Sequence, residues 1–335
     1  MQDLGIEKRR VWDHLTDLAA GGDVAAAFAP DALAQIAHPY GRCAGPAEIA
    51  PLYTDIRAAL PDANWRAEIF IAGENHSDPR VQVTRYSPLV ASLGHWQGTF
   101  AAPLWGIPPT FGAVHLRVCE VHHLNAAGQI AQSWILPDIL DLAHQAGVFP
   151  LPPMLGAPGL WPGPSGGGVR LDITDAERGR DSLNRVLDMH HALHAFDGVR
   201  IESMPMHHWA PGFMYYAAAG IGTSRGLDGF RAHHQIPFLR AFPDRRGAGH
   251  FVRIGDGDFA LTGGRVTASH LGEYLGMAPT GRQVAIDVMD FYRFDANGLI
   301  AENWLPFDIV GLANQMGVDL LARIAHLAGA PRRAL

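Results

Sequence analysis

Alternation of apolar and polar residues predicts two corresponding strands in the chain. Between 284 and 294, one face carries Val284, Ile286, Val288, Asp290, Tyr292 and Phe294. Between 114 and 124, the corresponding face carries Val114, Leu116, Val118, Glu120, His122 and Leu124. Because successive side chains of a strand point to opposite faces, each strand turns one carboxylate toward its apolar side.

Helical periodicity surrounds these strands in each half of the chain. Apolar residues recur at helical spacing in residues 6–18 and 183–193, and a shorter helical segment precedes each Pro-Asp turn. A last helical segment follows Trp134 in the first half and Trp304 in the second. Helices, then strands joined by tight turns, then a final helix predict an α+β fold in which a curved antiparallel sheet wraps around helices.

A repeat with a constant offset of 170 residues relates the two halves, as the positions of their matching residues show. The identical pairs include Gly128/Gly298, Trp134/Trp304, Asp138/Asp308, Leu142/Leu312 and Gln145/Gln315. The period is far too long for a solenoid repeat, so it indicates duplication of a whole domain. We expect one domain at 1–150, a Pro/Gly-rich linker at 151–170 and a second domain at 171–330.

Composition and charge narrow the classes of function. The net charge of the 335 residues is -7 and no Lys/Arg block stands out, so neither nucleic acid nor an anionic membrane is an expected partner. The only lysine is Lys8, which leaves no Walker phosphate loop and no buried lysine for a Schiff base. Cys43 and Cys119 do not suggest a disulfide framework. With neither a secretion signal nor a long apolar span, the sequence predicts a cytoplasmic protein.

Asp138 and Asp308 each stand four residues after a tryptophan, where a strand gives way to a helix. One interpretation is structural, because aspartate is among the best residues at a helix N-cap. The other is functional: a general acid or base at a pocket mouth, beside an aromatic wall that raises its pKa. The two interpretations are compatible.

Glu120 and Asp290 are less expected, since each lies on the apolar face of its strand. A buried carboxylate is costly unless it is paired, is protonated or lines a cavity. A structural pair with Arg117 or Arg293 is the alternative, but those neighbours point to the other face. We therefore predict a cavity in each domain, lined by Glu120 in the first and by Asp290 in the second. The aromatic wall is expected to contain His122 and Trp134 in the first domain and Tyr292 and Trp304 in the second.

Histidine is abundant, with 18 residues. His190 and His194 have the i, i+4 spacing of a zinc site, but without HExxH or an obvious third ligand we expect no metal. His95 and His270 lie on strand-like segments and are candidates for proton transfer near neutral pH. Other residues expected to contact a substrate are His234, His250 and Tyr215.

Two stretches of the second half, residues 219–244 and 269–317, carry a family resemblance. They include AGIGTSRGLDGF and the ending GLIAENWLPFDIVGLANQMG. This half resembles the SnoaL-like polyketide cyclases of the nuclear-transport-factor-2-like superfamily. The first half matches less fully, through residues 60–62, 104–110 and 128–147.

The resemblance implies two tandem cone-shaped domains, each with a deep pocket and with neither cofactor nor metal. It implies acid–base roles for Asp308 and for Asp290, His270 or Tyr292. The counterparts in the first half are Asp138, Glu120, His95 and His122. It further implies that the halves pair as a pseudo-two-fold dimer within one chain, and it leaves an additional homodimer open.

These features predict a cofactor-independent enzyme that acts on an apolar carbonyl compound: an aldol-type cyclase, a hydratase or a related lyase or isomerase. An aspartate would remove a proton alpha to the carbonyl, and a histidine or tyrosine would donate to the enolate oxygen. The alternative is a small-molecule binding protein of the same fold without turnover. Metal-dependent hydrolysis at the histidines is a third interpretation.

Overall fold

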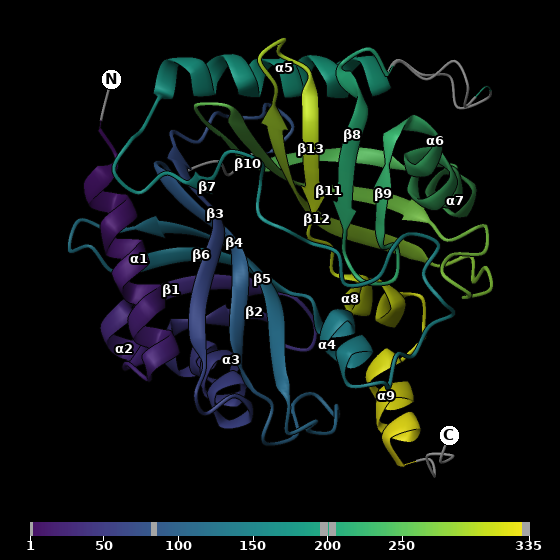
Figure 1. Cartoon of the computed structure of the whole chain (residues 1–335), viewed down its shortest axis with the longest axis horizontal. Coiled ribbons are helices and arrows are strands. Elements are labelled where there is room, and N and C mark those ends of the chain that lie inside the picture. The colour runs from purple at the N-terminus through teal and green to yellow at the C-terminus, as the bar shows by residue number, and fades with distance from the viewer. Residues whose placement is uncertain (1–2, 82–85, 195–199, 201–205, 330–335) are drawn as a thin grey trace.

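The computed structural model describes residues 3–81, 86–194, 200 and 206–329. Two curved sheets lie against each other, and helices cover the side of each sheet that faces away from the other (Figure 1). The predicted α+β class with two tandem domains is confirmed by these two sheets.

The first domain follows the predicted order of helices, strands and a final helix. Its elements are α1 (Gly5–Ala20), α2 (Val24–Ala27), β1 (Phe28–Ile36), β2 (Gly41–Ala44), α3 (Gly45–Ala59), β3 (Asn64–Gly73), β4 (Leu89–Thr99), β5 (Ala113–Leu124), β6 (Ile130–Pro137) and α4 (Ile139–Gln145).

The second domain repeats that order after a short linker strand, β7 (Gly168–Val169). Its elements are α5 (Ala176–His194), β8 (Trp209–Ala217), β9 (Thr223–Arg225), α6 (Gly226–Phe230), a π-helical turn (Arg231–Gln235), α7 (Ile236–Ala241), β10 (Arg246–Asp256), β11 (Phe259–Ser269), β12 (Gln283–Phe294), β13 (Ile300–Leu305), α8 (Ile309–Gln315) and α9 (Leu320–Gly329).

The two sheets share one strand arrangement. The first sheet runs β2-β1-β6-β5-β4-β3-β7. Written in the same direction, the second sheet runs β9-β8-β13-β12-β11-β10, so corresponding strands occupy corresponding places and β7 is an additional edge strand. Most neighbouring strands are antiparallel, as the sequence predicts. The first strand of each domain, however, pairs in parallel with the last, β1 with β6 and β8 with β13. The long path between these strands around the sheet allows this parallel pairing.

The alternation predicted for the two matching strands is confirmed by their burial. Ile286 and Tyr292 of β12 belong to the core inside the second domain. Met289 and Phe291 point the opposite way and join a second apolar cluster with residues of the first sheet, including Val121 of β5. The two halves therefore pack through the outer faces of their sheets, away from the helices.

The linker is part of this packing. β7 extends the edge of the first sheet beside β3. Trp161 is buried in the apolar cluster between the sheets, and the guanidinium carbon of Arg117 lies 4.5 Å from the centre of its ring. Both cysteines, Cys43 and Cys119, are buried and unpaired. No helix in the described part of the chain is long and apolar enough to cross a membrane.

A buried ion pair adds a polar tie between the halves. Lys8 of α1 and Asp256 of β10 both have fully buried side chains, and their Nζ and Oδ2 atoms are 2.6 Å apart. The ammonium group also donates to the carbonyl oxygens of Arg170 and Ile173, each at 2.7 Å. The only lysine in the chain is thus buried, contrary to the sequence prediction, and it acts as a clamp that holds together the first helix, the linker region and the second sheet.

Candidate functional site

A cavity of about 250 Å³ lies inside the second domain, between its sheet and its helices. Much of the wall is apolar, formed by Leu193, Phe230, Phe238, Leu239, Val266 and Val288. Polar groups reach it from several elements: His190, His234, His250, Thr262 and Asp290. An apolar chamber with a few convergent polar groups is typical of a small-molecule site.

Asp290 is the carboxylate inside this chamber. It lies on β12 opposite Thr262 of β11. Asn303 donates from Nδ2 to its Oδ1 at 3.2 Å, and the carboxyl also accepts a hydrogen bond from the Tyr292 hydroxyl. Burial raises the pKa of Asp290 to about 7, although these two hydrogen bonds act in the lowering direction. The group therefore changes protonation state near neutral pH, as a general acid or base requires.

The Tyr292 hydroxyl connects Asp290 to His190. His190 of α5 places Nε2 at 3.2 Å from this hydroxyl oxygen, and its ring stacks on that of His250 with centres 5.1 Å apart. Burial, together with the charge of Asp290, raises the pKa of Tyr292 well above its usual value, so the hydroxyl keeps its proton. A hydroxyl that accepts from one neighbour and donates to another can pass a proton between them.

Local backbone features aim His250 into the cavity. The pairing of β10 with β11 shifts register on both sides of His250, so the strand bulges there. A Cβ atom at Gly264 would lie 2.7 Å from Cδ2 of this ring. The absence of a side chain at Gly264 therefore leaves space for the imidazole of His250.

His234 and Tyr215 were both expected to contact a substrate. His234 lines the cavity, and burial lowers its pKa to about 4, so the ring is neutral near pH 7. Tyr215 stands behind it, with ring centres 5.1 Å apart, and is itself buried. Tyr215 thus supports the wall through His234.

Pairing with arginine, the structural alternative for the inward carboxylates, is contradicted. Arg293 forms its ion pair with Glu302 on the outer face of the sheet. Arg117 does the same with Asp138 and Asp141 in the first domain. Asp290 is left facing the cavity.

In the first domain, by contrast, the equivalent interior is filled by side chains. Glu120 is 1% exposed; it accepts a hydrogen bond from the Tyr53 hydroxyl at 3.1 Å and lies 3.3 Å from Nε2 of His122. Trp96, which packs beside Tyr53, occupies the strand position that Val266 holds in the second domain. The larger indole explains why the first interior is packed where the second is hollow.

Trp134 and Trp304 do not wall the cavity, contrary to the sequence prediction. Trp304 pairs with Phe291 across β12 and β13, which places it on the face opposite Asp290. Its ring stacks on Tyr216, and Trp134 stacks on Phe251 between the two sheets. Alternation within one strand does not determine its register with the next, and that register decided which way these indoles point.

Asp138 and Asp308 are helix N-caps, as the structural interpretation predicts, and they also join the two halves. Asp308 accepts from the Gly311 amide of its own helix at 2.7 Å and from the His38 amide of the first domain at 3.0 Å. Asp138 likewise accepts from the amides of Asp141 and of Ala219, in the second domain. Asp308 borders only a space of about 30 Å³ between the sheets. Burial raises the pKa of both carboxyl groups.

His95 and His270 do not reach the cavity either. The ring of His270 lies against Phe242, and its Nδ1 is 3.1 Å from the Thr280 hydroxyl, so it fixes a loop. His95 is paired with Arg117 in the β4–β5 register and therefore shares the outer face with it. Burial lowers the pKa of His95 to about 4, which makes it a poor acid at neutral pH.

The zinc interpretation of His190 and His194 finds no ligand set. The side chain of His194 lies outside the described residues, and His190 contacts Tyr292 and His250 instead. Among the side chains that the structure describes, no three His, Cys, Asp or Glu residues gather as a metal site requires.

Sequence reasoning missed several residues of this site. Asn303 is one of them. It is the counterpart of Ser133 at the 170-residue offset, and the two residues occupy the same place in their sheets: Asn303 pairs with Tyr292, and Ser133 pairs with His122. Arg245 and Arg80 also line the cavity. Arg80 belongs to the first domain, and no local pattern in the sequence indicates that it contacts the cavity of the second domain.

Comparison with known proteins gives a family match for one half. A model of the SnoaL-like polyketide cyclase family matches residues 194–316, which include β8 to β13. The resemblance noted in the sequence is thereby confirmed for these residues. None of the curated proteins matches the chain.

Several solved structures are similar to part of the chain. AclR from Streptomyces galilaeus is 24% identical over 41% of this chain and 82% of its own, with a TM-score of 0.35. TsrD from Streptomyces laurentii is 22% identical over 41% and 96%, with a TM-score of 0.34. An NTF2-like protein from Burkholderia thailandensis is 20% identical over 40% and 96%, also with a TM-score of 0.34.

Proposed function

We propose, on the premise that the C-terminal half carries a SnoaL-like polyketide cyclase domain, that its cavity catalyses proton transfer at a carbon next to a carbonyl. Asp290 is the base, and the ligand is a small, largely apolar carbonyl compound. The reaction belongs to the enolate class, which includes aldol-type cyclisation and related lyase or isomerase steps.

One observation carries this proposal: a carboxyl with a pKa of about 7 borders an apolar cavity. A carboxylate with its ordinary pKa near 4 would be a weak base toward an α-proton. Raising the pKa by burial strengthens the base while a useful fraction stays ionised at neutral pH. Perturbed carboxyls of this kind concentrate at functional sites.

The chemical step needs only groups of this chain. The Asp290 carboxylate takes the α-proton, and the C–H electron pair moves into an enolate whose charge rests mainly on oxygen. Once Asp290 carries the proton, the Tyr292 hydroxyl can donate to that oxygen instead, and the ring of His190 or His250 is a further nearby donor. The protonated Asp290 then returns its proton to carbon, which closes the cycle. Alternatively, the enolate attacks a second carbonyl of the same molecule, and the alkoxide that forms takes the proton back from Asp290.

A substrate-independent assay tests this function. We expect the protein in heavy water to exchange the α-protons of β-tetralone, or of an aromatic β-ketoester, at least about tenfold faster than buffer alone. Proton NMR follows the loss of the α-signals. Because the carboxylate is the active form, the rate should rise with pH through about 7 and level off above it.

Binding of these compounds without faster exchange would contradict the proposal. If these compounds bind in the cavity, as shown by shifts of Tyr292 or His250 signals, but exchange no faster than in buffer, the domain is a binding protein. A rate that is independent of pH between about 5 and 9 would also exclude Asp290 as the base.

A further inference from the structure

A segment of the first domain, residues 74–81, reaches the mouth of the cavity in the second. It follows β3 and lies beside β10. The His76 amide donates to the carbonyl oxygen of Arg253 at 2.9 Å, and the Arg253 amide donates to Asn75 Oδ1 at 2.8 Å. In the second domain the residues between β10 and β11 form only a short turn, 257–258, so the segment is an insertion specific to the first domain.

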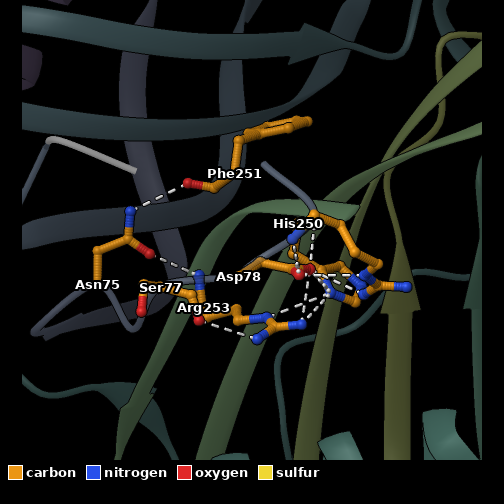
Figure 2. Close-up of polar contacts among 7 residues, drawn as sticks. Asn75, Ser77, Asp78, His250, Phe251 and Arg253 are labelled. Carbon is orange, nitrogen blue, oxygen red and sulfur yellow. Dashed lines mark hydrogen bonds and ion pairs between the residues drawn. The ribbon is translucent and has the colours of Figure 1, made fainter. Parts of the chain in front are cut away.

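Asp78 fixes the segment at its tip, where it contacts His250 and Arg253 (Figure 2). Its side chain is only 1% exposed. Its Oδ2 accepts from the His250 amide at 2.8 Å and from the Arg253 guanidinium at 2.7 Å. Arg80 binds both carboxylate oxygens, at 3.0 and 2.8 Å. Burial acts to raise the pKa of Asp78. The hydrogen bonds and the charge of Arg253 outweigh burial and hold this pKa well below its usual range.

The segment also packs closely against the backbone of β10. A Cβ atom at Gly249, whose φ is +102°, would lie 2.5 Å from a methyl carbon of Val81 and 3.1 Å from Cβ of Arg80. Glycine at 249 thus permits both the backbone conformation and the close approach. Arg80 is held in the cavity wall by this contact and by Asp78.

A second arginine of the wall has no counter-charge. Arg245, just before β10, is partly buried and lines the cavity. Among the described residues its guanidinium makes no ion pair or hydrogen bond. Burial alone lowers its pKa, with no carboxylate to offset the effect. A partly desolvated guanidinium without a counter-charge attracts an anion, so this part of the wall favours a negatively charged group in the ligand.

The charge balance of the wall supports an anionic ligand. Arg265 is neutralised by two hydrogen bonds from its guanidinium to Asp287, each at 2.7 Å. Arg80 shares Asp78 with Arg253, so this group of three carries one surplus positive charge. Arg245 adds another, and the remaining acid of the wall is Asp290, deep on β12.

We propose that the ligand of this cavity is an apolar compound that bears a carboxylate, which Arg245 binds together with Arg80 from the first domain. The inference rests on the proposed function of the cavity and names the chemical class of its substrate. Arginine suits this role because its planar fork matches the two oxygens of a carboxylate. The first domain, with its own interior packed, then acts as a specificity element for the second.

Two probes with the same ring system, one with a carboxylate and one with a neutral hydroxyl group, test this assignment. Calorimetry on the full chain would compare naphthaleneacetate with the neutral naphthylethanol. We expect the acid to bind at least about tenfold more tightly, as a charge-assisted contact in a desolvated site implies. Arg245→Gln should abolish the preference, Arg245→Lys should restore part of it, and Arg80→Gln should weaken it several-fold. Arg246→Gln, an exposed neighbour that does not line the cavity, is the matched control.

The outcomes separate this inference from the proposed function, because binding is measured without turnover. A preference for the acid that survives in both Arg245→Gln and Arg80→Gln would overturn it. So would the absence of acid-selective binding, whether both probes bind equally or neither binds. Acid-selective binding without any α-proton exchange would support the anion site and reject the chemistry.

Discussion

Replacing Asp290 by asparagine is expected to slow α-proton exchange by about 10²- to 10⁴-fold, the usual contribution of a positioned general base. Asparagine keeps the shape of the side chain and its contact with Asn303, but an amide cannot accept the α-proton. The protein should therefore fold and bind the probe while losing its pH-dependent rate. Proton NMR in heavy water measures the exchange rate, and circular dichroism checks the fold.

Two other aspartates provide the controls. Asp287→Asn changes a carboxylate of the same strand that lies on the face opposite Asp290 and pairs with Arg265. Its exchange rate should stay within about threefold of the original, because the amide oxygen can still accept a hydrogen bond from Arg265 and Asp290 is unchanged. Asp308→Asn should leave the chemistry in place and cost about 1 kcal/mol of stability, because asparagine caps a helix as well as aspartate but has one acceptor oxygen for the two amides of Gly311 and His38. If Asp308→Asn removed the activity and Asp290→Asn did not, the roles assigned to these two residues would be reversed.

Replacing Lys8 by methionine should destabilise the protein by about 3–5 kcal/mol, the typical cost of removing one partner from a buried ion pair. The change leaves the carboxylate of Asp256 fully buried with Arg170 as its remaining cation, and two carbonyl oxygens lose their donor. Urea unfolding would measure the loss, which should affect both halves because the clamp joins them.

The neighbouring residue supplies a matched control for this prediction. Arg9 also pairs with an aspartate, Asp172, but both side chains are more than half exposed, at 59% and 63%. Arg9→Met should therefore cost less than about 1 kcal/mol. Equal losses for the two variants would show that burial of the Lys8 pair contributes nothing special to stability.

The fold could be predicted well because its signals are local or repeated. Alternation from Val284 identified β12 and placed Asp290 on the inner face, and the constant offset placed Glu120 at the same position in the first domain. The parallel pairing of the first and last strands in each sheet was not predicted, because alternation is the same for parallel and antiparallel neighbours.

The candidate site could be predicted only in part. The inward direction of Asp290 follows from period two, whereas that of Trp304 depends on the register between β12 and β13, which no single strand encodes. The capping role of Asp308 could be predicted from its position after the strand, whereas its contact with the His38 amide of the other domain is visible only in three dimensions.

The difference between the two interiors was open to sequence reasoning and was not used. The offset that relates Glu120 to Asp290 also relates Trp96 to Val266, and the exchange of an indole for an isopropyl group leaves space in the second domain. By contrast, the reach of Arg80 into the other domain depends on a tertiary contact at Gly249, which becomes visible only in three dimensions.

The ionisation of Asp290 offers the most direct test of the central claim, that burial in this cavity creates a base for neutral pH. Carbon-13 NMR of aspartate-labelled protein would follow its carboxyl signal, assigned by its absence in Asp290→Asn. The account predicts an apparent pKa of about 7. A pKa below about 5, within the ordinary range for aspartate, would contradict it.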